Sequence, residues 1–453
     1  MSHSGIHLID RDRLRKRSHL EVQVAMLEAA LSSVDPEALV RQHVVVANEA
    51  LRIDGREHTL GDRRVWILSI GKAAVPMAQA VESLVGVERI SGGVAVTRKG
   101  YGASMDVVRV IEAEHPIPED TVGADAIAEL AGQVRPDDLV LCLLSGGGSA
   151  LLASPPSSVS VSELARATEL LLESGATIDE VNTVRRHVSC LQGGQLMARL
   201  APATVITLLL SDVIGDRLES IASGPTVPDP SSFSDARAVL QDHQLWNRIP
   251  DSIRTHVQSG IASQVPETPK PGNPMFETAQ AVLVGNNDTA VRALAAAARA
   301  FRFDVHVHPE SLMGEARNVG FQLADTAVQL SGSAWGNWAL IAGGETTVTV
   351  RGDGLGGRNQ ELALAAALRL EGIEGLSLAA LATDGTDGPT AAAGALIDGE
   401  TAAWARRRGM DPSDALERND SHAVLDATQD LLWTGPTRTN VADLVLVLGE
   451  ART

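Results

Sequence analysis

The chain has 453 residues, of which 44% are hydrophobic and 21% charged, and its net charge is −19 at pH 7. This length and composition are typical of a globular protein with two domains. The acidic balance argues against a nucleic-acid partner, because binding a phosphate backbone requires a basic face. Two cysteines, Cys142 and Cys190, are too few for a disulfide framework or a zinc site.

The first twenty residues carry charges where a signal peptide would have an apolar run. No segment approaches the ~20 consecutive apolar residues of a membrane span. We therefore expect a cytoplasmic protein with no membrane partner. Cys142 lies within the apolar run LVLCLL and is expected to be a buried small hydrophobic residue.

Short apolar runs alternate with alanine-rich helical stretches, which predicts an α/β fold with parallel strands. The predicted strands are Val65–Ile70, Gly93–Thr97, Leu139–Leu144, Val205–Leu210, Val282–Val284, Asp304–His308, Ala339–Ala342, Leu376–Ala382 and Asp443–Leu448. The predicted helices are Leu20–Val34, Ala73–Leu84, Ser162–Ser174, Thr183–Leu191, Thr289–Ala300, Glu315–Leu330, Asn359–Arg369 and Glu400–Arg407. Residues 263–278 hold four prolines and read as a linker between an N-terminal part, 1–262, and a C-terminal part, 279–453.

The first candidate for chemistry is Lys72, in the turn SIGKAA directly after the strand Val65–Ile70. Ligands of open α/β folds bind at the carboxyl ends of the strands. A cation is disfavoured near a helix N-terminus, so a lysine in this turn indicates a functional ammonium that can meet a transferring phosphoryl group. The alternative is a solvated lysine at a helix start.

The segment Ser145-Gly146-Gly147-Gly148-Ser149 follows the strand Leu139–Leu144. Three glycines between serines favour a backbone nest for a phosphate or carboxylate. The segment is neither a Walker motif, which needs GK[ST], nor a nucleophile elbow, which needs Gly-x-Ser-x-Gly. A tight turn with close packing is the alternative interpretation.

Farther along, the sequence VNTVRRH predicts Asn182 as an N-cap with Arg185 and Arg186 in the first turns of a helix. Two cations there are unfavourable unless they face an anion, so Arg185 is a candidate anion ligand. The histidines His115 and His187 are expected to be structural rather than catalytic. The fragment Asp420-Ser421-His422 resembles part of a triad but has no supporting elbow, and the tryptophans form no stacking platform.

Paired carboxylates follow two further strands. Asp212 and Asp216 come after Val205–Leu210, and Asp384 and Asp387 come after Leu376–Ala382. One or two carboxylates together with substrate oxygens suit Mg²⁺, so all four are candidate metal ligands. Capping and turn formation by aspartate are the alternatives.

The most informative stretch is Ile341–Leu370, in which six glycines precede Arg358 and an uninterrupted helical run. A glycine-rich loop lets backbone N–H groups close on an anion, and the following helix adds its positive end. The planar guanidinium of Arg358 suits phosphate. The binding candidates in this stretch are Gly344, Glu345, Gly356, Gly357 and Asn359.

Taken in order, seven segments resemble the class II glycerate 2-kinase family, whose C-terminal part is named MOFRL. They are SIGKAA, LLSGGGSALL, VNTVRRH with GGQL, SDVIGD with SGPT, GGETTVTVRGDGLGGRNQELAL, TDGTDG and TGPTRTNVADL, and they span Gly71 to Leu444. The resemblance implies ATP-dependent phosphorylation of D-glycerate at the 2-hydroxyl, with a divalent metal such as Mg²⁺. It also implies a Rossmann-like N-terminal domain, a smaller C-terminal α/β domain and an active site in the cleft between them.

By this resemblance the family's catalytic lysine falls on Lys72 and its catalytic arginine on Arg358. Cys190 and Gln192 occupy positions that are often basic in the family, and Arg438 stands where glycine is common. We expect Lys72 and Arg358 to hold the γ-phosphoryl group, the aspartates to hold Mg²⁺, and the triple-glycine segment with Arg185 to position substrate or nucleotide oxygens.

Two other functions remain open. A hydroxypyruvate reductase needs the fingerprint Gly-x-Gly-x-x-Gly after a strand, whereas Gly352–Gly357 has a different glycine spacing and follows a hairpin-like strand expected at Thr346–Val350. A non-catalytic sugar-acid binding protein would bind the ligand and consume no ATP. A homodimer is a reasonable expectation for the assembly.

Overall fold

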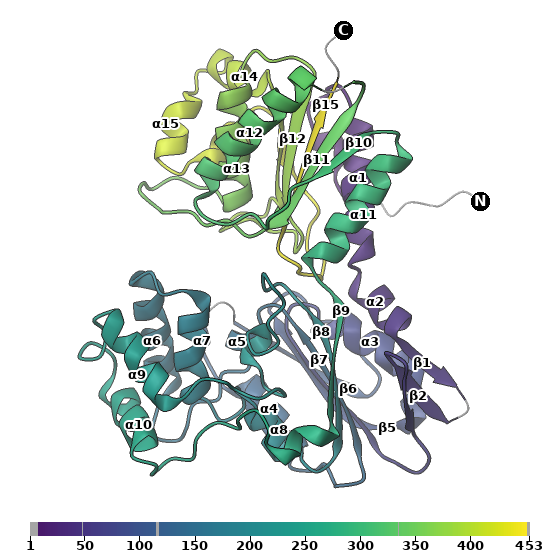
Figure 1. Cartoon of the computed structure of the whole chain (residues 1–453), viewed down its shortest axis with the longest axis vertical. Helices are drawn as coiled ribbons and strands as arrows, with labels where there is room; N and C mark the ends of the chain where they lie inside the picture. Colours follow the sequence, from purple (N-terminus) through teal and green to yellow (C-terminus); the bar gives the residue numbers. More distant parts are fainter. Residues whose placement is uncertain (1–7, 48, 115–116, 334, 451–453) are drawn as a thin grey trace. The chain divides into compact units, whose positions relative to one another are not determined.

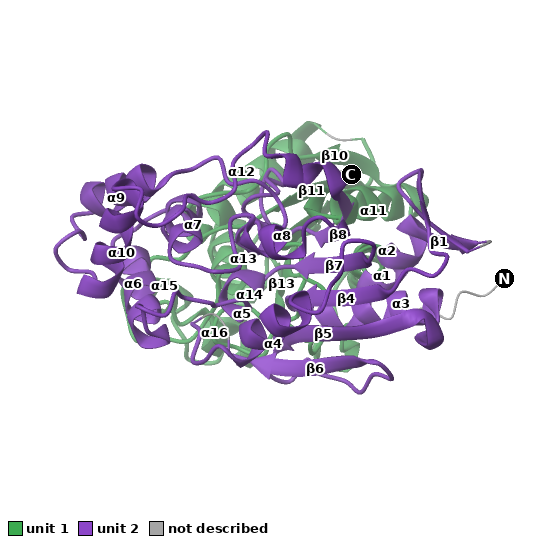
Figure 2. Cartoon of the chain, turned by 90° about the horizontal axis from the view of Figure 1, so that it is seen from below, with its two compact units in different colours: residues 1–35, 285–453 green, residues 36–284 purple. Residues whose placement is uncertain are grey.

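The computed structural model describes residues 8–47, 49–114, 117–333 and 335–450, so His115 lies outside the described residues. The chain forms two compact units, coloured separately in Figure 2. Unit 2 is Pro36–Val284, and unit 1 combines the segment up to Asp35 with the segment from Gly285 onward. Across the described residues, no helix is long and apolar enough to cross a membrane.

Unit 2 is built on a six-stranded sheet in the order β6-β5-β4-β7-β8-β9. The strands are β4 Val65–Ile70, β5 Ile90–Arg98, β6 Val108–Ala113, β7 Leu139–Ser145, β8 Thr204–Leu210 and β9 Ala279–Gly285. The pairs from β6 to β8 are all parallel. Every residue of the central strands β4 and β7 is buried, as their continuous apolar sequences predicted. The Rossmann-like α/β fold expected for this part is confirmed.

Helices cover both faces of this sheet, which is why the central strands β4 and β7 are buried along their whole length, whereas the edge strand β6 exposes Arg109 and Glu112. α4 (Val122–Ala131) and α8 (Gln195–Leu200) pack on one face, while α2 (Pro36–His43) and α3 (Ala74–Val85) lie on the other (Figure 1). A separate helical cluster with its own core holds α6 (Val161–Glu173), α7 (Ile178–His187), α9 (Phe233–Asp242) and α10 (Asp251–Ile261). A small antiparallel sheet holds β1 (Val44–Ala47), β2 (Ala50–Ile53) and β3 (Arg56–Thr59), and α5 (Gly148–Leu151) follows β7.

Unit 1 holds a second six-stranded sheet, in the order β10-β11-β15-β12-β13-β14. Its strands are β10 Asp304–Val307, β11 Trp338–Gly344, β12 Leu376–Ala382, β13 Gly394–Asp398, β14 Leu431–Leu432 and β15 Asp443–Gly449. β10 and β11 are parallel, but the other described strand pairs of this sheet are antiparallel, so the expectation of parallel strands is wrong for it. A strand buried on both faces reads as a continuous apolar run whichever way it points, so the sequence carried no sign of direction.

The helices of unit 1 form two layers around this sheet (Figure 1). α1 (Leu20–Ser33) and α11 (Asn287–Ala300) cover one face, and α12 (Ala316–Ser333) and α13 (Arg358–Leu370) cover the other. Three short helices pack around α13, namely α14 (Thr401–Arg407), α15 (Pro412–Glu417) and α16 (Ser421–Ala427). Gln23 of α1 donates to Leu446 O (3.1 Å) and accepts from Ser377 Oγ (2.9 Å), which ties α1 to β15 and β12.

The compact units divide the chain differently from the predicted parts 1–262 and 279–453. Residues up to Asp35 join the C-terminal part through α1, and the proline-rich segment 263–278 lies within unit 2. There Thr268 Oγ1 donates to Asp229 Oδ2 (2.9 Å), and Asp229 N donates to Pro269 O (2.9 Å). These two hydrogen bonds, one between side chains and one between backbone groups, attach the proline-rich segment to unit 2.

Candidate functional site

The first candidate site lies at the topological switch point of unit 2. The chain proceeds from β4 to β5 and β6 on one side and to β7 and β8 on the other, so β4 and β7 are the neighbours from which the connections diverge. Ligands of doubly wound sheets bind at this point, outside the carboxyl ends of the strands. Lys72 follows β4 there, and the triple-glycine segment follows β7.

These two turns are joined by direct hydrogen bonds. Lys72 N donates to Gly146 O (2.9 Å), and Ala73 N donates to the buried Ser145 Oγ (3.0 Å). A Cβ at Gly71, whose φ is +126°, would lie 2.2 Å from Ser145 Oγ, so only glycine permits this approach. The structure therefore places Lys72 beside the triple-glycine segment. The Ser145 hydroxyl joins the two turns by its hydrogen bond with Ala73 N.

The triple-glycine segment packs on a strained turn at Ala222–Ser223, and the sequence analysis did not predict that strain. A Cβ on Gly148 would lie 2.7 Å from Ala222 Cβ, and Ser149 Oγ is 2.8 Å from Ser223 Oγ. Ala222 and Ser223 have φ of +50° and +58° in the left-handed region, which few residues other than glycine adopt. Backbone strain of this kind costs about 1–3 kcal/mol per residue and collects at functional sites.

Arg185 lies on α7, but in the last turn of the helix and not in the first turns, where the sequence predicted it. The helix spans Ile178–His187, because Thr177 and Glu180 form a capping box at its start. The prediction of Asn182 as an N-cap is therefore wrong, and the helix predicted at Thr183–Leu191 is present but begins and ends earlier. Arg185 thus lies in the last turn, where the helix dipole favours a cation, and the dipole argument for an anion does not hold. The spacing Thr177-x-x-Glu180 was the signal that could have located the helix start.

A different observation keeps Arg185 a candidate anion ligand. Within the described residues it forms no ion pair with a carboxylate, and its Nη1 donates to the neutral Asn182 Oδ1 (3.0 Å). Burial lowers the pKa of the Arg185 guanidinium to about 10, so the group is still charged at neutral pH. Its neighbour Arg186, by contrast, is paired with Asp229 (3.0 Å). A desolvated cation without a counter-charge is suited to bind an anionic ligand.

Asp212 and Asp216 follow β8, whose carboxyl end lies at the same sheet edge as those of β4 and β7. Both side chains are partly exposed. Asp216 has a φ of +51° and its N–H donates to Val213 O (3.0 Å), so it also closes a turn. Gln192 is buried and donates from Nε2 to Ser149 O (2.7 Å), which attaches the Gly193–Gly194 turn to the triple-glycine segment.

The second candidate site lies in unit 1 and centres on Arg358, the first residue of α13. Its Nε and Nη2 donate to the two oxygens of Asp443 (2.5 and 3.0 Å), and its Nη1 lies 2.7 Å from Glu345 Oε1. Burial alone would lower the pKa of Arg358, but the charges of Asp443 and Glu345 outweigh it and raise the pKa. Arg358 is therefore permanently charged and held in one orientation.

Asp443 is a site residue that the sequence reasoning missed. It is buried at the start of β15 and lies opposite Gly344 of β11 and Ala382 of β12 in the antiparallel register. The reversed direction of β15 thus places this carboxylate between the carboxyl ends of two neighbouring strands. The apolar run after Asp443 marked a strand, but only its direction reveals that Asp443 faces Arg358.

Both carboxylate oxygens of Asp387 accept hydrogen bonds from the start of α13 in unit 1. Its Oδ1 accepts from Asn359 N (3.1 Å) and Nδ2 (3.3 Å), and its Oδ2 accepts from Gln360 N (2.9 Å) and Nε2 (3.0 Å). Burial and the charge of Asp443 raise the pKa of Asp387 to about 6. Asp387 thus holds the first turn of α13 together with Asn359, and this use of both oxygens argues against metal coordination. A Cβ on Gly357 would lie 2.3 Å from Asp387 Cγ.

The glycine-rich loop of unit 1 is held by protein partners. Asn419 Oδ1 accepts from Arg351 N (2.7 Å) and Gly352 N (3.2 Å), and Asp420 Oδ1 accepts from Leu355 N (3.1 Å). A Cβ on Gly356 would lie 2.2 Å from Ser421 Oγ. These glycines therefore permit close packing on the segment before α16. The strand expected at Thr346–Val350 is absent; only Thr347 forms an isolated bridge there, with Glu315.

Three further predicted positions belong to the same edge of unit 1. Gly344, with φ of +150°, lies against the backbone of Leu312, where a Cβ would be 2.3 Å from Leu312 N. Asp384 Oδ1 accepts from Thr386 N (3.0 Å), and the neighbouring Gly385 packs on Gly435 O. The exposed Arg438 has a φ of +61°, a conformation that glycine adopts at less cost, which explains why glycine suits this position.

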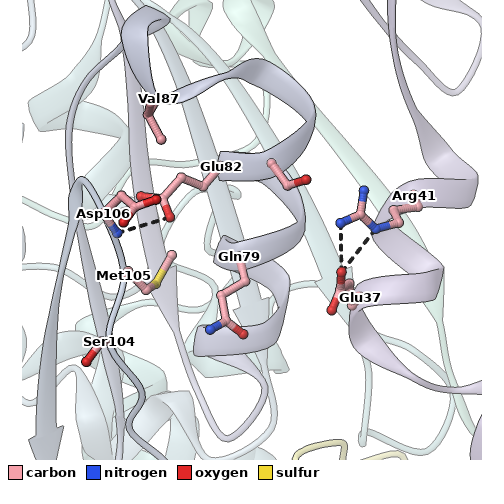
Figure 3. Close-up of a pocket in the computed structure, with 9 residues that line it drawn as sticks. Glu37, Arg41, Gln79, Glu82, Val87, Ser104, Met105 and Asp106 are labelled. Carbon is pink, nitrogen blue, oxygen red and sulfur yellow. Dashed lines mark hydrogen bonds and ion pairs between the residues drawn. The ribbon is translucent and has the colours of Figure 1, made fainter.

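Among the described residues, no three His, Cys, Asp or Glu side chains converge in an arrangement that could hold a metal ion. A surface hollow of about 500 Å³ in unit 2 is lined in part by Glu37, Arg41 and Glu82 (Figure 3). The Glu82 carboxylate accepts from Val107 N (2.7 Å) and Val108 N (3.2 Å), so it orders the entry to β6. This hollow therefore lies beside structural carboxylates, at the end of α3 remote from Lys72.

Comparison with known proteins identifies the family. The profile of a domain of unknown function, DUF4147, matches residues 22–258, and that of the MOFRL family matches residues 338–443. A glycerate 2-kinase of Pyrococcus horikoshii is 39% identical over 434 residues, which cover 94% of this chain and 97% of that protein. A D-glycerate 2-kinase of Thermotoga maritima is 39% identical over 431 residues, covering 91% of this chain and 99% of that protein.

The folds agree as well. A crystal structure of glycerate kinase from Thermotoga maritima superposes with a TM-score of 0.80 at 38% sequence identity, covering 95% of this chain and 99% of that one. The chain therefore belongs to the glycerate kinase family, with a DUF4147 part followed by a MOFRL part.

Proposed function

We propose that this protein transfers the γ-phosphoryl group of ATP to the 2-hydroxyl of D-glycerate, giving 2-phosphoglycerate and ADP. The observation that carries the proposal is the placement of buried Lys72 beside the triple-glycine segment at the switch point of a Rossmann-like sheet. The relatives named D-glycerate 2-kinase and glycerate 2-kinase support the same reaction.

In this proposal the protein acts by positioning and charge neutralisation, as is usual for phosphoryl transfer. Lys72 and Arg358 hold phosphoryl oxygens while negative charge spreads over them. Asp443 fixes Arg358 through Nε and Nη2, and the exposed Glu345 is the partner that a phosphoryl oxygen would replace at Nη1. Arg185, Ser149 and the triple-glycine segment position the oxygens of the substrates.

A magnesium ion fits part of the predicted carboxylate set. Mg²⁺ commonly takes one or two carboxylates and completes its shell with waters and substrate phosphates, so it needs no enclosed protein site. We propose Asp212 and Asp216 in unit 2, and Asp384 in unit 1, as candidate ligands for Mg²⁺. Asp387 is the member that does not fit, because four hydrogen bonds use its oxygens. When bound, Mg²⁺ would neutralise charge on the phosphates of ATP.

A coupled assay tests the proposal. Purified protein is mixed with ATP, Mg²⁺ and D-glycerate, and the product is passed to enolase and pyruvate kinase without phosphoglycerate mutase. Enolase accepts 2-phosphoglycerate, so pyruvate formation supports transfer to the 2-hydroxyl. ADP release without pyruvate would indicate another acceptor position or another acid. NADH-dependent loss of hydroxypyruvate without ATP would instead support the reductase, and ligand binding without turnover would support a binding protein.

A further inference from the structure

A chain of hydrogen bonds in unit 2 connects Arg185 to the triple-glycine segment. Asn182, which is 1% exposed, accepts at Oδ1 from both Arg185 Nη1 (3.0 Å) and Ser223 Oγ (3.0 Å). Ser223 Oγ in turn lies 2.8 Å from Ser149 Oγ. The strained turn at Ala222–Ser223 is what brings the Ser223 hydroxyl to this position.

The direction of each hydrogen bond in this chain is determined by chemistry. An arginine only donates, so the atom of Asn182 that faces Arg185 is the amide oxygen. Ser223 must then give its only hydroxyl proton to the same oxygen. Ser149 consequently donates its proton to Ser223, and toward any ligand its Oγ can act only as an acceptor.

The directions of these hydrogen bonds limit which ligands Arg185 and Ser149 can bind. Arg185 offers a charged planar donor, which matches a carboxylate or a phosphate. Ser149 requires a hydrogen-bond donor as its partner, which a substrate hydroxyl supplies and the ionised phosphates of a nucleotide do not. A hydroxy acid supplies both groups on adjacent carbons.

We propose that Asn182 is a positioning residue that directs Arg185 to the carboxylate of the hydroxy-acid substrate and, through Ser223, makes Ser149 the acceptor for a substrate hydroxyl. The inference rests on the proposed function and names the part of unit 2 that recognises its acid substrate. Asn182 is too buried to touch the ligand itself and acts through its two neighbours.

The test compares steady-state kinetics of Asn182→Ala, Asn182→Asp and the wild type. In Asn182→Ala, Arg185 loses the hydrogen bond that orients it. The KM for D-glycerate should therefore rise about tenfold or more, while the KM for ATP should stay within about twofold of the wild-type value. Asn182→Asp should raise it further, because the new carboxylate would pair with Arg185 and compete with the substrate. The preference for D-glycerate over its neutral amide should fall in both variants, which a merely structural residue would not cause.

Thr168→Val is the matched control, since Thr168 is also buried in the helical cluster and its hydroxyl donates to Leu164 O of the same helix, α6 (2.9 Å). It should lose stability and keep both KM values. If Asn182→Ala does not fold, Ser223→Ala replaces it. That variant should raise the KM for D-glycerate and keep the preference for the acid over the amide.

Calorimetric titration with D-glycerate distinguishes a failure of the proposed function from a failure of the role of Asn182. A wild type that binds D-glycerate without turning it over would overturn the proposed function alone. Equal affinities of wild type and Asn182→Ala, or equal increases in both KM values, would overturn the role of Asn182.

Discussion

Asp443 holds Arg358 through two parallel hydrogen bonds, from Nε and Nη2, while the third nitrogen of the guanidinium faces the exposed Glu345. One partner is buried at the start of β15 and the other is accessible, so the two carboxylates have different roles. The first fixes the orientation of Arg358. In the proposed mechanism the second gives way to an anionic ligand.

We therefore expect Asp443→Asn to lower kcat by about 10²-fold, because a misplaced guanidinium loses the preorganised stabilisation of the transition state. Glu345→Gln should change kcat by less than about tenfold and act mainly on the KM for ATP. Steady-state kinetics with ATP and D-glycerate measures both. A larger loss of kcat in Glu345→Gln than in Asp443→Asn would reverse the roles assigned here.

Lys72→Ala and Arg358→Ala should each lower kcat by about 10²–10³-fold, the usual result of removing one electrostatic stabiliser. The fold should remain intact, which circular dichroism and thermal unfolding can verify. Lys99→Ala is the control, since Lys99 is exposed and pairs with Glu114 on the surface. Near-normal kcat in Lys72→Ala or Arg358→Ala would remove that residue from the catalytic assignment.

The two thiols should differ in reactivity. Cys142 is fully buried in β7, and burial raises its pKa to about 12, so only about 10⁻⁴ of it is thiolate at pH 8. Cys190 is partly exposed and its pKa is raised less. A disulfide reagent such as DTNB should thus modify Cys190 alone in the native protein, and Cys142 only after denaturant is added. Two equally fast thiols would contradict the placement of β7 in the core.

Acid stability should depend on Asp138, at the end of the unit 2 sheet opposite Lys72. Burial acts to raise its pKa, but hydrogen bonds from Arg64, Arg135 N and Trp66 outweigh burial and lower the pKa. The carboxylate therefore stabilises the fold above its unfolded pKa of 3.8, and this contribution is lost as the pH falls through the lower folded pKa.

Asp138→Asn should accordingly lower the free energy of unfolding by about 1–3 kcal/mol at pH 7, with a smaller difference from wild type near pH 3. Urea denaturation at both pH values measures this. Asp62→Asn serves as the control, because Asp62 is exposed in the turn before β4. An equal difference at the two pH values would show that the charge of Asp138 does not contribute.

Much of the site in unit 2 followed from the sequence, because parallel strands bring the turns after them to one edge. The apolar runs located β4, β7 and β8, and Lys72, Gly146 and Asp212 follow them directly. The network around Asn182 could not be predicted in the same way. It depends on the true start of α7 at Ile178 and on a left-handed turn at Ser223.

In unit 1 the missing information was strand direction. Asp443 reaches Arg358 only because β15 runs opposite to β11 and β12, and an apolar run has no direction. Asp387 shows a second limit. Its sequence context equally suits a metal ligand and a helix cap, and only the four hydrogen bonds to Asn359 and Gln360 distinguish them.

The most direct test of the central claim is the structure of the reaction product. Phosphorus NMR of the mixture formed from ATP, Mg²⁺ and D-glycerate should show a phosphate ester coupled to the single proton on C2. Coupling to the two protons of C3 would contradict transfer to the 2-hydroxyl. An unchanged ATP spectrum would contradict phosphoryl transfer to D-glycerate altogether.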